Sequence, residues 1–193
     1  DADLVEFRLP STPSATAACD EVLRACGVNG RFVAINPGAG SSSRRWPTER
    51  YAEVACRVWC TLGVPSLIVW GTESERTAAN QIAESGGEGC RVAPPTSLTT
   101  LIAVLRRAAC VVSGDTGPLH MAAAVNTPCV GIYGPTWPEF SGPFGSGHIV
   151  VRGGWRAPHP LKWRSAPPDV MLQIPAEDVF QACLAVLNRT CDV

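Results

Sequence analysis

Short apolar runs alternate along the chain with segments of helical periodicity. The runs are rich in β-branched residues and are continuous rather than interrupted by polar positions, a pattern typical of strands buried on both faces of a sheet. They lie at residues 32–35, 66–70, 110–113, 129–133 and 148–151. These runs predict five buried strands.

Helical periodicity fills the stretches between the runs and is bounded by start and stop residues. Pro47 stands at a first helical position, Gly63 lies just past the end of that helix, and Ser97 is a favourable N-cap. Gly27 closes the first helical pattern in the same way. The predicted helices span residues 15–26, 47–62, 73–84, 118–125 and 175–188, and one more begins after Ser97.

Strands that alternate with helices form a parallel sheet with helices on both faces. Right-handed crossovers then give an α/β, doubly wound, Rossmann-like domain. We assign residues 31–193 to this domain and residues 1–30 to an interdomain segment with a lead-in helix. Residues 153–168 are rich in Pro and Trp and have no periodicity. We expect them to form a long loop that is functional or faces a partner.

Composition and charge narrow the class of protein. The chain has 193 residues, which suits one domain, and a net charge of -1, which gives no indication of binding to nucleic acid or to an anionic membrane. No stretch approaches the roughly 18 apolar residues of a membrane span. The chain begins at Asp1 rather than Met, which suggests a fragment or a processed product.

The nine cysteines lie mostly inside apolar runs and form no Cys-x-x-Cys pair. Cys56 and Cys60 are one helical turn apart, but no second pair completes a zinc site. We therefore expect small buried thiols in a reducing cytosol rather than disulfides or metal ligands.

The loop after the first predicted strand, residues 36–47, reads Asn-Pro-Gly-Ala-Gly-Ser-Ser-Ser-Arg-Arg-Trp-Pro. Its glycines let the backbone approach a ligand closely, and Ser41 and Ser42 supply hydroxyl donors. Arg44 and Arg45 carry permanent charge on planar groups that match phosphate oxygens. The Gly-Lys-Ser/Thr ending of a Walker loop is missing. The loop indicates an anion site, and the alternative is a plain turn with solvated arginines.

A second strand-end loop, residues 113–120, opens the helix predicted at 118–125. Gly114 and Gly117 allow tight backbone geometry, and Pro118 stands where the helix begins. The unpaired N–H groups of the first helical turn and the helix dipole form an anion site without any cation. Thr116 adds a hydroxyl donor. His120, one turn into the helix, either faces the same ligand or is structural.

Acidic residues at the strand ends leave two interpretations open. Asp115 either turns away from a phosphate towards a sugar hydroxyl or caps its own turn. Glu73 and Glu75 start a helix, where negative charge is favourable, and one of them is also a candidate acceptor for ribose hydroxyls. Thr136, after the strand at 129–133, is a further candidate donor.

Taken together, these loops resemble those of the ADP-heptose:lipopolysaccharide heptosyltransferases, which form glycosyltransferase family 9. The resemblance covers residues 32–136, with a weaker echo at Met171, Ile174 and Val179. The Asp-Thr-Gly-Pro-x-His segment, combined with the Trp-Pro helix start, is quite specific. The matching motifs are Asn-Pro-Gly-Ala-Gly (36–40), Arg-Arg-Trp-Pro (44–47), Val-Trp-Gly with Glu75 (69–75), Gly-Asp-Thr-Gly-Pro with His120 (114–120) and Gly-Ile-Tyr-Gly-Pro-Thr (131–136).

The resemblance implies the two-domain GT-B architecture, of which this chain looks like the carboxyl-terminal domain. In the family, that domain binds the nucleotide sugar, while the amino-terminal domain binds the lipopolysaccharide core acceptor and supplies an aspartate as general base. The chain alone is then expected to be inactive. The implied partners are the nucleotide sugar and, through the missing domain, the acceptor. No cofactor and no metal are expected.

Carried over position by position, the resemblance also implies roles for residues. Arg44 falls on the family's lysine that pairs with the diphosphate, and as a catalytic residue it would stabilise the leaving group. Glu75 falls on the glutamate that contacts the nucleoside. The implied nucleotide-sugar-binding residues are Ser41, Ser42, Arg44, Glu75, Asp115, Thr116, Gly117 and His120.

Two features depart from the family. An arginine in place of the lysine keeps the charge but changes the geometry. A Trp- and Pro-containing stretch, residues 155–160, replaces a Cys-rich stretch, so the role of the tail is open.

The implied reaction transfers heptose from ADP-heptose to the lipopolysaccharide inner core with inversion at the anomeric carbon. Negative charge grows on the β-phosphate as the bond breaks, and Arg44 and the helix start near Gly117 are aimed there. Two alternatives stay open: a GT-B domain for another nucleotide sugar, and a nucleotide-binding module without catalysis. The implied location is the bacterial cytoplasm, and a peripheral position at the inner membrane is left open.

Overall fold

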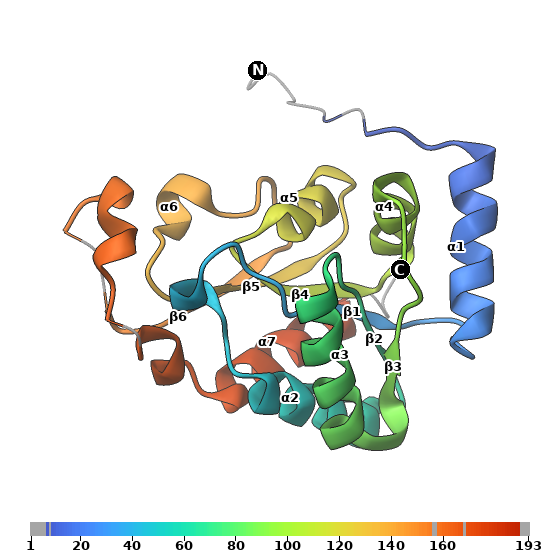
Figure 1. Cartoon of the computed structure of the whole chain (residues 1–193), viewed down its shortest axis with the longest axis horizontal. Helices are drawn as coiled ribbons and strands as arrows, with labels where there is room; N and C mark the ends of the chain where they lie inside the picture. The colour runs from blue at the N-terminus through green and yellow to red at the C-terminus, as the bar shows by residue number, and fades with distance from the viewer. Residues whose placement is uncertain (1–6, 8, 156–157, 168, 190–193) are drawn as a thin grey trace.

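The computed structural model describes residue 7 and residues 9–155, 158–167 and 169–189. Strands and helices alternate along this part of the chain (Figure 1). The strands are β1 (Val33–Asn36), β2 (Ser66–Ile68), β3 (Cys90–Val92), β4 (Cys110–Gly114), β5 (Cys129–Tyr133) and β6 (Ile149–Arg152). The α-helices are α1 (Pro13–Ala25), α2 (Thr48–Leu62), α3 (Glu73–Gly86), α4 (Leu98–Arg107), α5 (Gly117–Ala124), α6 (Pro138–Ser141) and α7 (Ala176–Arg189). Short 3₁₀ helices are η1 (Ser42–Arg44), η2 (Gly87–Gly89), η3 (Pro160–Ser165) and η4 (Val170–Gln173).

The six strands form one sheet in the order β3-β2-β1-β4-β5-β6, and every neighbouring pair is parallel. The order runs outward from β1 in both directions, which is the doubly wound arrangement. All carboxyl ends of the strands therefore lie along the same edge. The predicted α/β, doubly wound, Rossmann-like fold is confirmed.

Two apolar cores, one on each face of the sheet, hold the layers together. On one face, Val33 and Ile35 of β1 pack with α2, α3 and α7. On the other face, Ala34 of the same strand packs with α1, α4 and α5. Figure 1 shows these two groups of helices on opposite sides of the sheet. Because both faces are buried, β1, β4 and β5 need apolar residues at nearly every position.

Local capping explains where the helices begin and end. Ser97 Oγ accepts a hydrogen bond from Thr100 N at 3.1 Å and so caps α4. Gly63 follows α2 with φ of +65°, and Gly27 follows α1 with φ of +64°. Both are left-handed conformations that glycine adopts without a steric penalty. These start and stop signals were readable from the sequence, and the helices lie where they were expected.

Four features differ from the expectation, and one of them is the short helix α6 (Pro138–Ser141), which was not predicted. Strand β3 was not predicted, because it has three residues with exposed Arg91 at its centre and lies at the sheet edge. Strand β2 ends at Ile68 rather than at residue 70. The expected structureless loop at 153–168 contains η3 within its described residues. The cysteines agree with the prediction: of the eight that the structure describes, six are buried and all are free thiols.

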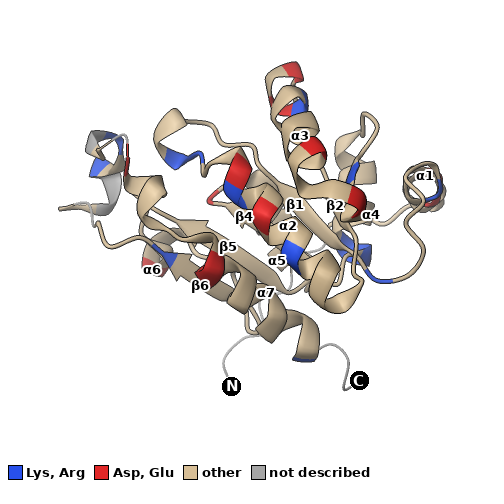
Figure 2. Cartoon of the chain, turned by 90° about the horizontal axis from the view of Figure 1, so that it is seen from below, with Lys and Arg blue, Asp and Glu red and all other residues tan. Residues whose placement is uncertain are grey.

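Charged side chains are scattered over the helices, and both signs mix on the face seen in Figure 2. Among the described residues, no helix combines the length and the apolar character that crossing a membrane requires.

Candidate functional site

Three loops meet at the carboxyl edge of the sheet, where ligands bind in doubly wound folds. They follow β2, β1 and β4, which are adjacent in the sheet. The loop after β1 leads through η1 to α2, the loop after β2 leads to α3, and the loop after β4 leads to α5.

Asn36, the last residue of β1, ties two of these loops together. It pairs in register with Ser113 of β4, and its buried Nδ2 donates to Ser113 Oγ at 3.0 Å and to Thr116 Oγ1 at 3.1 Å. Ser113 Oγ also lies 2.9 Å from Thr116 Oγ1 and donates to Gly114 O at 3.0 Å. This network holds the turn that precedes α5.

Helix α5 begins at the centre of the site without a side-chain cap. Thr116 is its N-cap residue in extended conformation, but its hydroxyl is turned to Asn36 and Ser113 instead of to the helix. Pro118 in the first turn has no N–H to satisfy. Leu119 N donates to Thr116 O at 3.1 Å, which leaves the Gly117 N–H as the open donor of the first turn, at the positive end of the helix dipole and in the wall of a cavity.

Glu75 joins the loop after β2 to the loop after β1. Its Oε2 accepts hydrogen bonds from Gly71 N at 2.9 Å and Thr72 N at 3.1 Å, and Thr72 Oγ1 accepts from Glu75 N at 3.3 Å. This reciprocal arrangement is a capping box for α3. The other carboxylate oxygen, Oε1, lies directly over Gly38, where a Cβ atom would stand only 2.2 Å away.

These loops enclose a cavity of about 310 Å³. Its wall is apolar at Val69, Leu98 and Leu101, and polar at Glu75 and Thr116. Leu98 is among the most exposed large apolar side chains of the described chain. An apolar wall with a few polar groups suits a flat ring that carries hydroxyls and an anionic tail.

Arg44 lies at the end of η1 and points towards the loop after β4. Its Nη1 donates to the backbone oxygen of Asp115 at 2.9 Å and lies 3.7 Å from Asp115 Oδ2. Gly40 leaves room for Nη2, because a Cβ there would stand 3.2 Å from it. Its Nε is buried and has no hydrogen-bond partner among the described residues.

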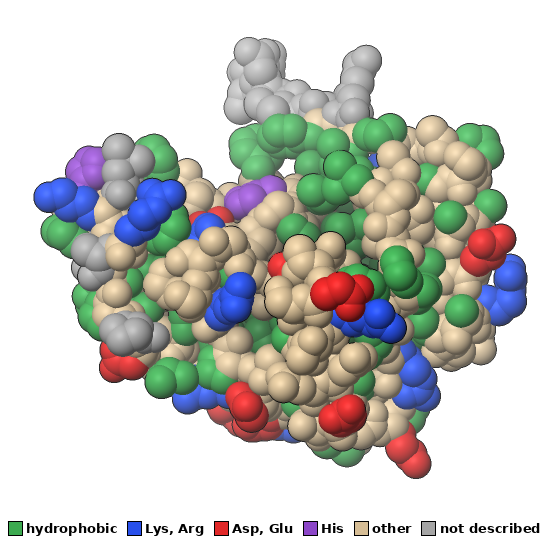
Figure 3. All heavy atoms as spheres, in the orientation of Figure 1, with side chains coloured by type: hydrophobic (Ala, Val, Ile, Leu, Met, Phe, Trp, Pro, Cys, Tyr) green, Lys and Arg blue, Asp and Glu red, His purple; other side chains and the backbone are tan. Residues whose placement is uncertain are grey.

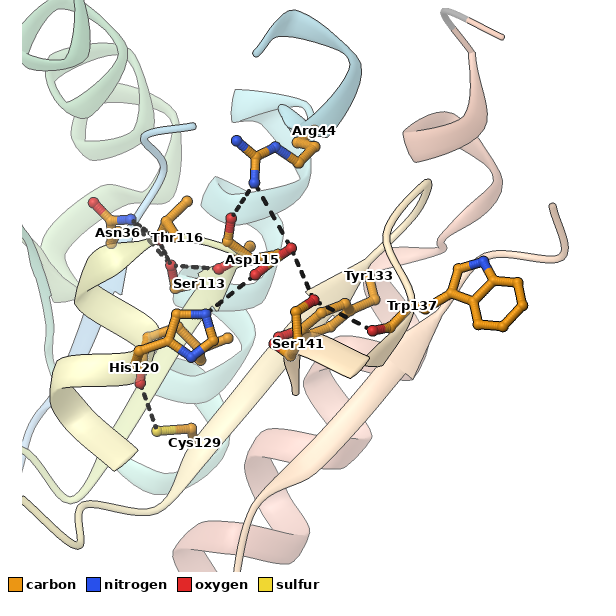
Figure 4. A network of polar contacts seen from close by, with 12 residues as sticks. Asn36, Arg44, Ser113, Asp115, Thr116, His120, Cys129, Tyr133, Trp137 and Ser141 are labelled. Carbon is orange, nitrogen blue, oxygen red and sulfur yellow. Dashed lines mark hydrogen bonds and ion pairs between the residues drawn. The ribbon is translucent and has the colours of Figure 1, made fainter. Parts of the chain in front are cut away.

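Asp115 is the centre of a polar network next to this arginine (Figure 4). Its Oδ1 lies 3.2 Å from His120 Nε2, and its Oδ2 accepts from Ser141 Oγ at 3.2 Å. Ser141 belongs to α6, whose position is fixed by Tyr133: the Tyr133 hydroxyl donates to Ser141 O at 2.7 Å. Asp115 does not cap its own turn through these oxygens. Its carboxylate is directed to His120, Arg44 and α6.

The surroundings keep Asp115 ionised. Burial alone would raise the pKa of its carboxyl group, but the hydrogen bond to His120 and the positive charges of His120 and Arg44 outweigh burial and lower this pKa. Because the folded-state pKa is depressed, the stabilising contribution of Asp115 is fully present at neutral pH and is lost only as the pH falls through that depressed value.

The structure places the predicted site residues in two groups at this edge and leaves two of them aside. In the cavity wall lie Glu75, Thr116 and Gly117, and in the polar network lie Arg44, Asp115 and His120. Ser41 Oγ lies 3.0 Å from Ser43 Oγ, and Ser42 is exposed at the start of η1. The ligand roles of all these residues stay predictions.

Sequence reasoning missed Asn36, Ser113 and Ser141 as parts of the site. A polar residue at the last position of a buried strand was the available signal for Asn36 and Ser113. Nothing local marks Ser141, because its contact with Asp115 spans 26 residues. Thr136 is buried, and its side chain lies close enough to Asp115 to help lower the pKa of that carboxyl group. Among those residues, no cluster of three or more His, Cys, Asp or Glu side chains is arranged to hold a metal ion.

A doubly wound parallel sheet whose glycine-containing loops line a cavity beside an uncapped helix start defines a Rossmann-like α/β domain. Comparison with known proteins gives the family. Residues 4–164 match the model of glycosyltransferase family 9 (heptosyltransferase). The chain belongs to glycosyltransferase family 9.

The relatives are longer than this chain. Lipopolysaccharide heptosyltransferase 1 of Pseudomonas aeruginosa is 30% identical over 148 residues, which are 77% of this chain and 41% of that protein. The structure of E. coli heptosyltransferase WaaC with ADP has a TM-score of 0.69 at 27% identity and covers 87% of this chain and 48% of that one. The same enzyme with ADP-2-deoxy-2-fluoro heptose gives a TM-score of 0.66.

A family 9 glycosyltransferase from Veillonella parvula shares the fold, with a TM-score of 0.84 at 23% identity over 94% of this chain and 54% of that one. The chain therefore matches about half of a GT-B heptosyltransferase.

Proposed function

We propose that this chain is the carboxyl-terminal, nucleotide-sugar-binding half of a heptosyltransferase and that its substrate is ADP-heptose. The observation that carries the proposal is the cavity between the loops after β1, β2 and β4, which is flanked by Arg44 and by the uncapped start of α5. The E. coli relative was solved with ADP and with an ADP-heptose analogue, which supports the same substrate class for this chain.

The adenosine occupies the apolar part of the cavity in this proposal. Leu98, Leu101 and Val69 supply the surface against which an adenine ring packs. Glu75 Oε1 is the acceptor for a ribose hydroxyl, because Oε2 is already used by the capping box.

The diphosphate lies between the start of α5 and Arg44. The backbone at Gly117 supplies one N–H donor and the positive end of the helix dipole. Thr116 Oγ1 accepts from Asn36 and donates to Ser113 Oγ, whose own proton goes to Gly114 O, so Thr116 orders the turn that presents the Gly117 N–H. Arg44 adds its charge and its unpartnered Nε. Charge that develops on the leaving β-phosphate meets these fixed donors, so they stabilise the transition state more than the ground state.

Asp115 and His120 face the sugar. A carboxylate beside a diphosphate is repelled unless it is paired, and Asp115 is paired with His120 and Arg44. Its remaining acceptor capacity suits the hydroxyls of a heptose. Ser41 and Ser42 lie on the loop that closes over the phosphates in this proposal.

The rest of the reaction depends on an amino-terminal domain. That domain would bind the lipopolysaccharide core acceptor and hold the general base, and transfer with inversion would take place between the two domains. The chain alone is expected to bind ADP without turnover. No step of this proposal requires a metal ion. The division into a lead-in segment (1–30) and the nucleotide-sugar domain (31–193) stays a prediction.

Calorimetric titration with ADP tests the assignment. Arg44→Ala is expected to weaken ADP binding by about tenfold or more, because it removes a charged hydrogen-bond donor worth roughly 1.5–3 kcal/mol. Arg45→Ala is the matched control: Arg45 is the next residue, carries the same charge and is exposed. Its affinity should stay within about twofold of the unmodified chain, since exposed charges act weakly.

Two results would contradict the proposal. Absence of ADP binding at millimolar concentration would reject the site, and equal loss of affinity in both variants would reject the specific role of Arg44. Titration with UDP and GDP decides between nucleotide sugars. Tighter binding of either would favour the GT-B alternative with another donor.

A further inference from the structure

The Pro- and Trp-rich segment after β6 returns to the phosphate side of the proposed site. Its helix η3 carries Trp163, and the guanidinium carbon of Arg44 lies over the Trp163 ring, 4.6 Å from the ring centroid. This contact joins residues that are far apart in the sequence. The proposed function does not use it.

A second contact anchors the same segment. Trp46, two residues after Arg44, donates from Nε1 to the backbone oxygen of Ile174 at 3.0 Å, and Arg50 donates to the same oxygen. Helix η4 also packs against η1. Ile174 and η4, which follow Trp163 in the chain, are thus bound to elements that contain or directly follow Arg44.

The planar shape of the guanidinium group determines which of its hydrogen bonds a contact with Trp163 leaves available. The group donates hydrogen bonds only in its plane, while its two faces interact with aromatic rings. The guanidinium carbon of Arg44 lies over the Trp163 ring, and a ring that covers one face of the group competes with none of its N–H donors. In the plane, Nη1 is bound to Asp115 and Nη2 lies beside Gly40. Nε is the buried donor without a partner among the described residues.

We propose that Trp163 is a positioning residue that stacks on Arg44 and fixes the plane in which Arg44 donates to the diphosphate. The proposal rests on the proposed function and names the residue that organises its phosphate cation. Without the ring, the long arginine side chain has to lose rotamer freedom when the ligand binds, which weakens binding. When the Trp163 ring is present, the Arg44 side chain is already largely ordered before the ligand binds.

The segment also adds positive charge at this end of the molecule. Arg164 lies over the same Trp163 ring, 4.3 Å from its centroid, and Lys162 is on the same short helix. Basic side chains gather over this part of the surface in Figure 3. Two guanidinium groups, those of Arg44 and Arg164, therefore lie over the Trp163 ring.

Nuclear magnetic resonance of the chain without ligand tests the stack directly. The Nε–H proton of Arg44 is expected at an upfield position because of the ring current of Trp163, and Arg44→Lys assigns that signal by its loss. Trp163→Leu should return the signal to an ordinary position, while Trp163→Phe should keep most of the shift. An Arg44 signal that does not move in Trp163→Leu would show that the stack is absent in solution.

Titration with ADP tests the consequence. Trp163→Leu is expected to weaken binding about five- to tenfold, while Trp163→Phe stays within about threefold of the unmodified chain, since phenylalanine retains an aromatic face. Trp59→Leu is the matched control, because Trp59 lies on α2 against Gly89, outside the site. It should leave ADP binding unchanged.

A double-mutant cycle separates positioning from packing. A lysine has no planar group to stack, so Trp163→Leu should change ADP affinity by less than about twofold in an Arg44→Lys background. An equal effect of Trp163→Leu in both backgrounds would reject the positioning role. If the unmodified chain does not bind ADP, the proposed function fails. If it binds and Trp163→Leu binds equally well, only the role of Trp163 fails.

Discussion

At Gly38, the missing side chain makes room for the Glu75 carboxylate. A Cβ at this position would stand 2.2 Å from Glu75 Oε1, which no real Cβ tolerates. The two residues come from different strand ends, so their contact sets the distance between the loops after β1 and β2. The glycine is required here for close approach, and no unusual backbone angle is needed to explain it.

Gly38→Ala is therefore expected to displace Glu75 and to break the capping box of α3. The loss of such a cap costs about 1 kcal/mol of unfolding free energy, which urea denaturation measures. The effect should nearly vanish in a Glu75→Ala background, because the clash is then gone and the cap is already lost. Equal destabilisation in both backgrounds would show that Gly38 is needed for another reason.

At the scale of elements, local signals predicted most of the fold. The ends of α1, α2 and α4 follow from Gly27, Gly63 and Ser97, whose effects act within a single turn. Strand β3 escaped prediction because an edge strand of three residues with Arg91 at its centre has no apolar run. Its pairing with β2, a tertiary contact, decides its conformation.

The site was only partly predictable for the same reason. Gly-rich and Ser-rich strand ends marked the loops that meet at the candidate site, and the helix start at Gly117 marked the position where we expect an anion. The sequence did not show which residues contact Asp115 and Arg44. Ser141 and Trp163 reach them only because distant segments of the chain fold together.

His148 connects the start of β6 to the start of β5. Its Nδ1 accepts from Cys129 N at 3.2 Å, and its Nε2 donates to Phe144 O at 3.0 Å, so the bonded form is the neutral ring. Burial lowers the pKa of this imidazole below its ordinary value of 6.5. Protonation puts a hydrogen on Nδ1 and breaks the bond from Cys129.

Stability should therefore decrease as the pH falls from about 6.5 through the lower folded-state pKa, because the unfolded chain takes up the proton first. Replacement of His148 by Gln removes this titration, and the unfolding free energy of the variant should be flatter across that range. The expected difference is about 1 kcal/mol, the net value of one hydrogen bond. An unfolding free energy that keeps the same pH dependence in His148→Gln would contradict this role of His148.

At the scale of the molecule, the helix before β1 is part of the second core. Val22 and Leu23 of α1 are buried, and so are Ala15 and Cys19 on the same face. This face packs with α4 and α5 against the sheet. This packing makes α1 part of the core of the domain, although the predicted boundary at residue 30 places α1 outside that domain.

Removal of residues 1–27 is expected to lower the unfolding free energy by about 3 kcal/mol or more, since each fully buried Val or Leu side chain contributes roughly 1.5–3 kcal/mol. Urea denaturation of the shortened chain measures the loss. An unchanged midpoint would instead support residues 1–30 as a separable lead-in segment.

The parallel sheet gives the molecule two opposite edges, and only one of them carries the candidate site. The carboxyl ends of the six strands lie along the edge that carries the candidate site, and their amino ends lie at the opposite edge. Cys60 is exposed near the end of α2, where the chain turns back into β2. A dye, a tether or a solid support attached through this thiol would leave the cavity, Arg44 and the start of α5 open to solvent. Because the partners of this chain are expected to approach at the edge that carries the cavity, Cys60 is a suitable attachment point.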